Sequence, residues 1–312
     1  MTTPPTDHVT RWSDALSRGQ RADLARAITA VENDGPDAPA IVQAAHGLAG
    51  RAMVVGFTGA PGAGKSTLVA AYVEELRRRD LSVGVLAVDP SSPLTGGALL
   101  GDRIRMLSHA GDRDVFVRSI ASRGHLGGLA PSACAVVNVM DASGRDVVVV
   151  ETVGVGQSEV EVTDLADVRV VVWTPGAGDD VQAAKAGLLE IADIIVVNKA
   201  DLPQAGATEA ALRSAASCRG AETPDILRTS AVRREGIGGL ADGIADRAGR
   251  ADGVRASGAE RRLRHQLSGR AAALVAEAIG GSRHLDALTA AMRSGEMSLD
   301  EAARALIAEL SI

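Results

Sequence analysis

The sequence predicts an α/β fold with a mostly parallel central sheet flanked by helices, plus N-terminal and C-terminal helical extensions. Short apolar runs alternate with helical stretches between residues 51 and 252, as is typical of parallel sheets covered on both faces. Only 2% of the 312 residues are aromatic, whereas 46% are hydrophobic, so Val, Ala, Leu and Ile fill the core. A glycine-rich loop separates the first apolar run from the first long helix of this region.

The expected elements follow in chain order. Two helices are expected between residues 8 and 50, because apolar side chains recur at helical spacing before a polar break at 33–39. Strands are then expected at 53–58, 83–88, 115–120, 147–150, 168–173, 194–197 and 226–229. Three further helices are expected at 259–279, 285–293 and 298–310, the last with Ser298 ahead of two acids as a start signal.

These elements divide the chain into three expected parts. Residues 1–50 form an N-terminal helical extension, 51–252 an α/β domain, and 253–312 a C-terminal helical segment with an expected role in dimerisation. Polar residues 250–258 are expected to link the last two parts. This size suits one large α/β domain with helical additions.

Composition excludes several classes of protein. The net charge is −6 and no long basic tract occurs, so nucleic acid is not an expected partner. Cys134 and Cys218 lie far apart and lack neighbouring metal ligands, which indicates free thiols in a reducing compartment. Residues 1–11 lack the apolar segment of a signal peptide, and no apolar run reaches the roughly 18 residues of a membrane span. A cytoplasmic protein without a membrane partner is therefore expected.

Lysine is rare in this chain, which holds only Lys65, Lys185 and Lys199. Basic positions elsewhere are arginine, so a retained lysine indicates that a compact ammonium group is needed rather than a planar guanidinium. Two of the three lysines lie in the motifs described next.

The glycine-rich loop fits the pattern GxxxxGK[ST] between an apolar run and a helix expected at 68–79. Its backbone N–H groups are predicted to surround a β-phosphate, Lys65 to reach the β and γ oxygens, and the Ser66 hydroxyl to bind Mg²⁺. The phosphate-binding residues predicted here are Gly59, Ala60, Pro61, Gly62, Ala63, Gly64, Lys65, Ser66 and Thr67.

A second motif is predicted to select the base. Asn198, Lys199 and Asp201 follow the apolar run 194–197, at the strand end where α/β sheets bind ligands. The Asp201 carboxylate can accept hydrogen bonds from guanine N1–H and the 2-amino group, whereas adenine offers no matching donors. The end of the next strand is predicted to contact guanine O6, through Ser230, Ala231 and Val232. The two motifs together favour GTP and GDP over adenine nucleotides.

A third segment predicts a sensor of the γ-phosphate. The apolar run 147–150 ends in Glu151, which can hold Mg²⁺ through water, and the Gly154 N–H can then bond the γ-phosphate. Asp89 and Asp102 are further candidate metal ligands, with a helix cap or surface role as the alternative for Asp102. No general base is evident, and Gln157 is the candidate for positioning the attacking water.

From residue 59 to 201 the chain resembles the MeaB/ArgK-type GTPases, the G-protein chaperones of adenosylcobalamin-dependent acyl-CoA mutases such as methylmalonyl-CoA mutase. The resemblance is carried by VDPSSP (88–93), TGG (95–97), LGDR (100–103), GHLGG (124–128), ETVGVGQSE (151–159) and GDDVQ (178–182). It implies a P-loop NTPase fold and a homodimeric GTPase that gates cobalamin cofactor loading or protection in its mutase.

The same resemblance implies roles for individual residues. Lys65 and Ser66 match the positions that bind phosphate and metal, and the Mg²⁺ environment would include Asp89, Asp102 and Glu151. A loop that relays the nucleotide state to the mutase matches Asp179, Gln182 and Lys185. Two alternatives are a metal-insertion GTPase, for which a Cys- or His-rich site is lacking, and an ATP-dependent kinase linked to basic amino-acid transport, against which the guanine motif argues.

Overall fold

The computed structural model describes residues 5–89, 111–121, 131–152, 165–176, 189–217, 223–250, 254–280, 282 and 284–309. The chain divides into two compact units, Met1–Arg262 and Leu263–Ile312, and each is described by itself.

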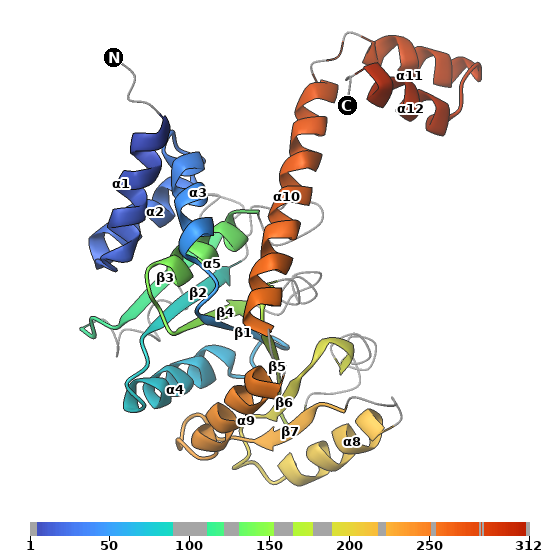
Figure 1. Cartoon of the computed structure of the whole chain (residues 1–312). Helices are drawn as coiled ribbons and strands as arrows, with labels where there is room; N and C mark the ends of the chain where they lie inside the picture. Colours follow the sequence, from blue (N-terminus) through green and yellow to red (C-terminus); the bar gives the residue numbers. More distant parts are fainter. Residues whose placement is uncertain are drawn as a thin grey trace. The chain divides into compact units, whose positions relative to one another are not determined.

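The first unit is built on a parallel sheet, in which the described strands follow the order β3-β2-β4-β1-β5-β6-β7 (Figure 1). The strands are β1 (Met53–Thr58), β2 (Val83–Asp89), β3 (Val115–Ala121), β4 (Val147–Thr152), β5 (Val168–Trp173), β6 (Ile194–Val197) and β7 (Asp225–Arg228). Every described pairing between these strands is parallel, so the predicted α/β fold is confirmed. The predicted bounds of β1, β5 and β6 are confirmed, and the ends of the other strands differ from the predicted ones by at most two residues.

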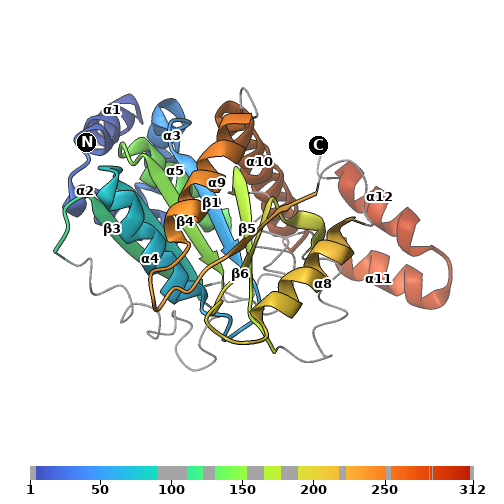
Figure 2. The ribbon, with the colours of Figure 1, turned by 90° about the horizontal axis from the view of Figure 1, so that it is seen from below.

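Helices cover both faces of this sheet (Figure 2). Alternate residues of β1 and β4 pack on one side against α4 (Lys65–Arg78) and α9 (Ile237–Arg250). On the other side they pack against α5 (Pro131–Ala142) and the N-terminal helices, while α8 (Ala205–Ser217) packs on β5, β6 and β7. The valine-rich runs of β1 and β4 are buried along their whole length, because a parallel sheet covered by helices offers no wet face.

The N-terminal extension holds three helices, α1 (Pro5–Ser17), α2 (Arg21–Glu32) and α3 (Ala38–Leu48), so the prediction of two is wrong. The chain turns at Gly19, whose φ is +61° and whose N–H donates to Leu16 O at 2.8 Å. A left-handed glycine after the last helical turn ends a helix. Leu16 and Leu24, on either side of this turn, pack into the same core. The apolar spacing therefore continues across the turn, and it does not reveal that one helix ends there and another begins.

A buried ionic cluster joins distant parts of the first unit. Asp141 of α5 accepts hydrogen bonds from the N–H groups of residues 50–52, at 2.7, 3.1 and 3.0 Å. Asp167 accepts one from Val54 N at 2.9 Å. The guanidinium of Arg262, which has no exposed surface, lies 3.6 Å from both carboxylates. Helix α10 (Val254–Gly280), which carries Arg262, begins inside the segment predicted as a linker, so the second half of that segment is helical.

The second unit contains the rest of α10, α11 (Leu285–Ser294) and α12 (Leu299–Glu309). The predicted start of the last helix is confirmed by a reciprocal cap: Glu301 N donates to Ser298 Oγ at 3.3 Å, and Ser298 N donates to Glu301 Oε2 at 2.9 Å. Ala302 and Leu306 are buried. Among the described helices, none combines the length and apolar character needed to cross a membrane.

Candidate nucleotide-binding site

The predicted site residues that the structure describes gather at the carboxyl edge of the sheet. Residues 59–64 connect the end of β1 to α4, Glu151 lies at the end of β4, and residues 198–201 directly follow β6. In the sheet β1 lies between β4 and β5, and Phe57 of β1 is paired with Glu151. Parallel strands thus bring three separate sequence motifs to one edge.

The glycine-rich loop has a conformation that its sequence requires. Gly64 has φ of +86°, and a Cβ added there would lie 2.6 Å from Asn198 Nδ2. A side chain at this position would be both strained and in collision, so glycine is needed. Around Gly62, by contrast, no described atom lies within 4 Å of an added Cβ. The loop therefore presents an open backbone surface ahead of the α4 N-terminus, where an anion is favoured.

Lys65 is the first residue of α4 and only 6% exposed. Its ammonium group folds back over the loop and donates to Gly59 O at 2.7 Å and to Ala60 O at 3.1 Å. Neutral carbonyl oxygens are weaker acceptors than phosphate oxygens, because hydrogen bonds to charged groups are stronger. The ammonium can thus exchange these carbonyls for phosphate, which fits the role predicted for it.

Ser66 and Glu151 form the described part of the predicted metal site. The Ser66 hydroxyl donates to Glu151 Oε1 at 2.6 Å, and both side chains are buried. Hydroxyl and carboxylate oxygens suit Mg²⁺, which usually takes one or two protein groups together with substrate phosphates and water. The described residues contain no group of three or more His, Cys, Asp or Glu that could hold a metal ion by itself. The donor set therefore fits Mg²⁺ bound together with a nucleotide.

Asn198 links the loops of the site through its side chain, which is 2% exposed. Nδ2 donates to Ala63 O at 2.9 Å, while Oδ1 accepts from Thr229 Oγ1 and from Ala231 N, both at 3.2 Å. These contacts join the glycine-rich loop to the turn after β7. Because one side-chain amide bonds to both segments, Asn198 fixes their relative position.

Asp201 is exposed and accepts a hydrogen bond from Ser230 Oγ at 2.7 Å. This bond holds the pKa of the Asp201 carboxyl below its ordinary value, so the group is ionised at neutral pH. Lys199 has φ of +56° and donates from Nζ to Gly62 O at 2.9 Å, which places its stem beside the phosphate loop. Val232 is 84% exposed and offers an apolar side chain close by in sequence.

Of the remaining predicted site residues, the structure describes only Asp89. Asp89 ends β2, next to β4, where Ala87 is paired with Glu151. Its backbone therefore lies at the same sheet edge as the Ser66 and Glu151 pair. Other predicted positions lie outside the described residues, namely Asp102, Gly154, Gln157, Asp179, Gln182 and Lys185, together with His125 and Cys218.

Two features of the first unit were missed from the sequence. The base motif pointed to Asn198, but its positioning role could not be predicted, because its partners Thr229 and Ala231 lie about 30 residues further along the chain. The cavity lined by Arg18, Arg113 and Arg145 had no such signal, because its residues are scattered over four segments of the chain.

A parallel sheet whose first strand leads through a glycine-rich loop into a helix that starts with Lys65 and Ser66 defines a P-loop nucleoside triphosphatase. Within this class, the model of the family "Methylmalonyl Co-A mutase-associated GTPase MeaB" matches residues 24–286. The chain belongs to this family, and the prediction that it is a GTPase is confirmed.

Individual relatives agree with this assignment. A relative from Pyrococcus abyssi is 49% identical over 239 residues, which cover 75% of this chain and 74% of the relative. GTPase ArgK of Escherichia coli is 47% identical over 190 residues, covering 60% of this chain and 57% of ArgK. A crystal structure described as LAO/AO transport system kinase superposes with a TM-score of 0.73 at 28% identity and covers 100% of both chains.

Proposed function

We propose that the chain is a GTP-binding and GTP-hydrolysing chaperone that gates cofactor loading or protection of an adenosylcobalamin-dependent acyl-CoA mutase of the methylmalonyl-CoA mutase type. The observation that carries this proposal is the family match over residues 24–286, because the description of that family names the mutase. A chaperone of this kind acts by binding its partner differently in its two nucleotide states.

Guanine recognition is assigned to Asp201, with support from Lys199 and from the turn at residues 230–232. The Ser230 hydroxyl orients the ionised Asp201 carboxylate, which can then accept from guanine N1–H and the 2-amino group. Adenine would leave this charge without a donor. Asn198 holds the phosphate loop and the base segment at a fixed separation.

Hydrolysis is assigned to Lys65, Glu151 and Gln157. Lys65 binds and orients the β- and γ-phosphates, and its burial strengthens its attraction to them. Mg²⁺, held by Ser66 and Glu151 with Asp89 and Asp102 nearby, would neutralise charge on the same phosphates. Gln157 would orient the attacking water, and the Gly154 N–H would bond the γ-phosphate.

Coupling to the mutase is assigned to Asp179, Gln182 and Lys185, in a loop whose arrangement would depend on the nucleotide. We also propose the three-part division at residues 1–50, 51–252 and 253–312, with the last part mediating a homodimer. Support comes from the second unit, which exposes several large apolar side chains, namely Leu263, Leu267, Leu274, Leu285, Leu299 and Ile307.

A second candidate is an ATP-dependent kinase linked to basic amino-acid transport, because a related crystal structure is described as LAO/AO transport system kinase. The Ser230 and Asp201 pair favours the guanine reading. A metal-insertion GTPase has no such support, since the described residues contain no cluster that could carry a metal as cargo.

Complex formation with a purified adenosylcobalamin-dependent methylmalonyl-CoA mutase tests the proposal. Association is measured by analytical ultracentrifugation with GDP, with a non-hydrolysable GTP analogue, and with ADP as the matched control. The affinity is expected to differ by about 10-fold or more between the two guanine nucleotides, since coupling energies between sites are typically of this size. Equal association under all three conditions would contradict the proposal, and an effect of ADP alone would favour the kinase.

A further inference from the structure

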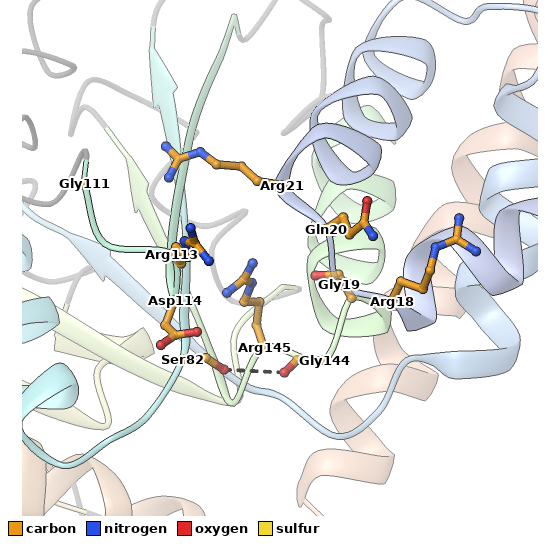
Figure 3. Close-up of a pocket in the computed structure, with 11 residues that line it drawn as sticks. Arg18, Gly19, Gln20, Arg21, Ser82, Gly111, Arg113, Asp114, Gly144 and Arg145 are labelled. Carbon is orange, nitrogen blue, oxygen red and sulfur yellow. Dashed lines mark hydrogen bonds between the residues drawn. The ribbon is translucent and has the colours of Figure 1, made fainter.

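A cavity of about 770 Å³ opens at the edge of the sheet opposite the nucleotide site (Figure 3). Its lining includes Ser82, Asp114 and Arg145, which directly precede or lie just before β2, β3 and β4. The nucleotide site lies at the other ends of these parallel strands. Because β2 is seven residues long, the two sites are separated by about 20 Å along the strands.

The lining of this cavity is strongly positive. It contains Arg18, Arg21, Arg113 and Arg145 but only one carboxylate, Asp114. Asp114 is already paired, because Arg77 Nη2 donates to its Oδ2 at 2.9 Å. The positive charge of the cavity is therefore not neutralised by its own lining.

Other nearby carboxylates already have partners, and one of them, Asp23, forms an ion pair with Arg18 of the lining. Asp112 Oδ2 accepts from Arg77 Nε at 2.9 Å, and Asp146 Oδ2 accepts from the Ser82 hydroxyl at 2.7 Å. Asp23 is hydrogen-bonded to Arg26 and lies 3.6 Å from Arg18. Among the described residues, no carboxylate forms an ion pair with Arg113 or Arg145.

The positively charged side chain of Arg145 is buried. The side chain is only 6% exposed, and its Nε is buried with no hydrogen-bond acceptor among the described residues. Burial lowers the pKa of this guanidinium, although arginine stays charged at physiological pH. Asp114 and Asp146 offset only part of the cost of burying this charge, because burial is the largest influence on its pKa, and a bound anion would recover more of that cost.

Contacts of Gly19 and of the Arg21 side chain hold the cavity in shape. Gly19, in the turn between α1 and α2, packs so closely on the turn after α5 that an added Cβ would lie 2.9 Å from Ser143 O. Arg21 Nη1 donates to Val115 O at 3.3 Å, and the guanidinium lies 5.9 Å from the centre of the Phe116 ring. In the view of Figure 3 the side chains of Arg21, Arg113 and Arg145 lie on one side of the cavity, whereas Arg18 points away from them.

We propose that this cavity binds a small molecule with two or more phosphate groups, at a site separate from the nucleotide site. Arginine is the side chain best matched to phosphate, because its planar group can donate two parallel hydrogen bonds to one phosphate. The guanidinium groups of Arg21, Arg113 and Arg145 that line the cavity together carry more N–H donors than one phosphate needs. The volume admits a nucleoside bisphosphate, whereas a nucleic-acid duplex would need an extended basic surface, which the chain's net charge of −6 does not favour.

The test is a calorimetric titration of adenosine 3′,5′-bisphosphate into the full chain saturated with GDP, so that the probe cannot enter the phosphate loop. Arg113→Gln and Arg145→Gln remove one charge each, and Arg304→Gln is the matched control, because Arg304 is exposed and lies outside the cavity. Wild type and the control are expected to bind one probe molecule. Each cavity variant is expected to weaken binding about 10-fold or more, since charged hydrogen bonds are lost.

Arg113 is exposed, so its variant keeps the test valid even where loss of the buried Arg145 harms folding. Absence of binding to wild type, or equal binding to all four proteins, would overturn the proposal. Binding of an acidic peptide with no binding of the bisphosphate would likewise overturn it in favour of a protein partner. Inorganic phosphate, titrated in parallel, is expected to bind more weakly than the bisphosphate, and equal affinity would contradict the requirement for two phosphate groups.

Discussion

The Ser66 hydroxyl lies 2.6 Å from Glu151 Oε1, and this hydrogen bond joins the first turn of α4 to the end of β4. The phosphate loop and the strand that leads into the predicted sensor are thereby connected inside the protein core. The bond therefore ties the N-terminus of α4 to the last residues of β4.

Glu151→Gln is expected to lower GTP hydrolysis by about 100-fold, in the range seen when one charged group of a catalytic site is removed. The neutral amide is a weaker ligand for Mg²⁺, while GDP affinity in the absence of Mg²⁺ should stay unchanged. Phosphate release and the fluorescence of a labelled GDP measure the two quantities. Glu277→Gln, in an exposed pair with Arg270, is the control. Hydrolysis at the wild-type rate in Glu151→Gln would exclude a role for this acid.

Asp201→Asn is expected to weaken GDP binding by about 100-fold, because two hydrogen bonds to a charged group are lost. Xanthosine diphosphate should bind the variant better than it binds wild type, since xanthine has a carbonyl at C2 to which the asparagine amide can donate. Competition with a labelled nucleotide measures both affinities, and Asp242→Asn is a surface control. If the variant kept its preference for GDP over xanthosine diphosphate, Asp201 would not be the base-reading residue.

Much of the first unit could be predicted from the sequence, for identifiable reasons. Short continuous apolar runs predicted β1 to β7, because strands of a parallel sheet that is covered on both faces are apolar at almost every position. The phosphate loop was predictable because Gly64 and Lys65 lie in one short segment that needs no tertiary information. Glu151 was predicted as a metal ligand, but its 2.6 Å contact with Ser66 depends on the adjacency of β1 and β4 in the sheet.

Features made by distant residues could not be predicted. In the Arg262 cluster, the arginine is more than 90 residues away in sequence from Asp141 and Asp167, which are themselves more than 20 residues apart. From the sequence alone, each of the three would be taken for an ordinary surface charge. The break at Gly19 was hidden by a hydrophobic spacing that continued across it. The cavity near Arg145 likewise depends on how four separate segments of the chain meet.

Arg262→Ala is expected to lower the free energy of unfolding of the first unit by about 3–5 kcal/mol, because two buried carboxylates lose their counter-charge. Urea unfolding, followed by the fluorescence of the buried Trp12, measures the change. Arg270→Ala removes an exposed ion pair and should cost less than about 1 kcal/mol. An equally small effect of both substitutions would show that the Arg262 cluster contributes little to stability.

Asp167 gives the same cluster a pH dependence with a definite sign. Burial raises the pKa of this carboxyl above its ordinary value of 3.8, so the folded state holds the proton more tightly than the unfolded state. As pH rises from 3.8 through the raised pKa, this group's contribution to the free energy of unfolding therefore falls. Asp167→Asn removes the titration, so the stability of wild type relative to the variant should decrease across that interval. A difference that is flat or that grows with pH would contradict the raised pKa.

The proposed coupling loop yields a prediction about Lys185, one of only three lysines in the chain. Lys185→Ala should leave GDP affinity close to that of wild type, because the residue lies outside both the phosphate motif and the base motif. It should nevertheless remove the response of GTP hydrolysis to the mutase, since the loop would report the nucleotide state to the partner. Lys65→Ala, which disables phosphate binding itself, is the contrasting variant.

The most direct measurement is the rate of GTP hydrolysis by the wild-type chain with and without an adenosylcobalamin-dependent methylmalonyl-CoA mutase. The mutase is expected to raise the rate several-fold in wild type and to leave it unchanged in Lys185→Ala, because the partner and the nucleotide act on the same two states. A wild-type rate that is unaffected by saturating mutase would contradict the proposed chaperone function.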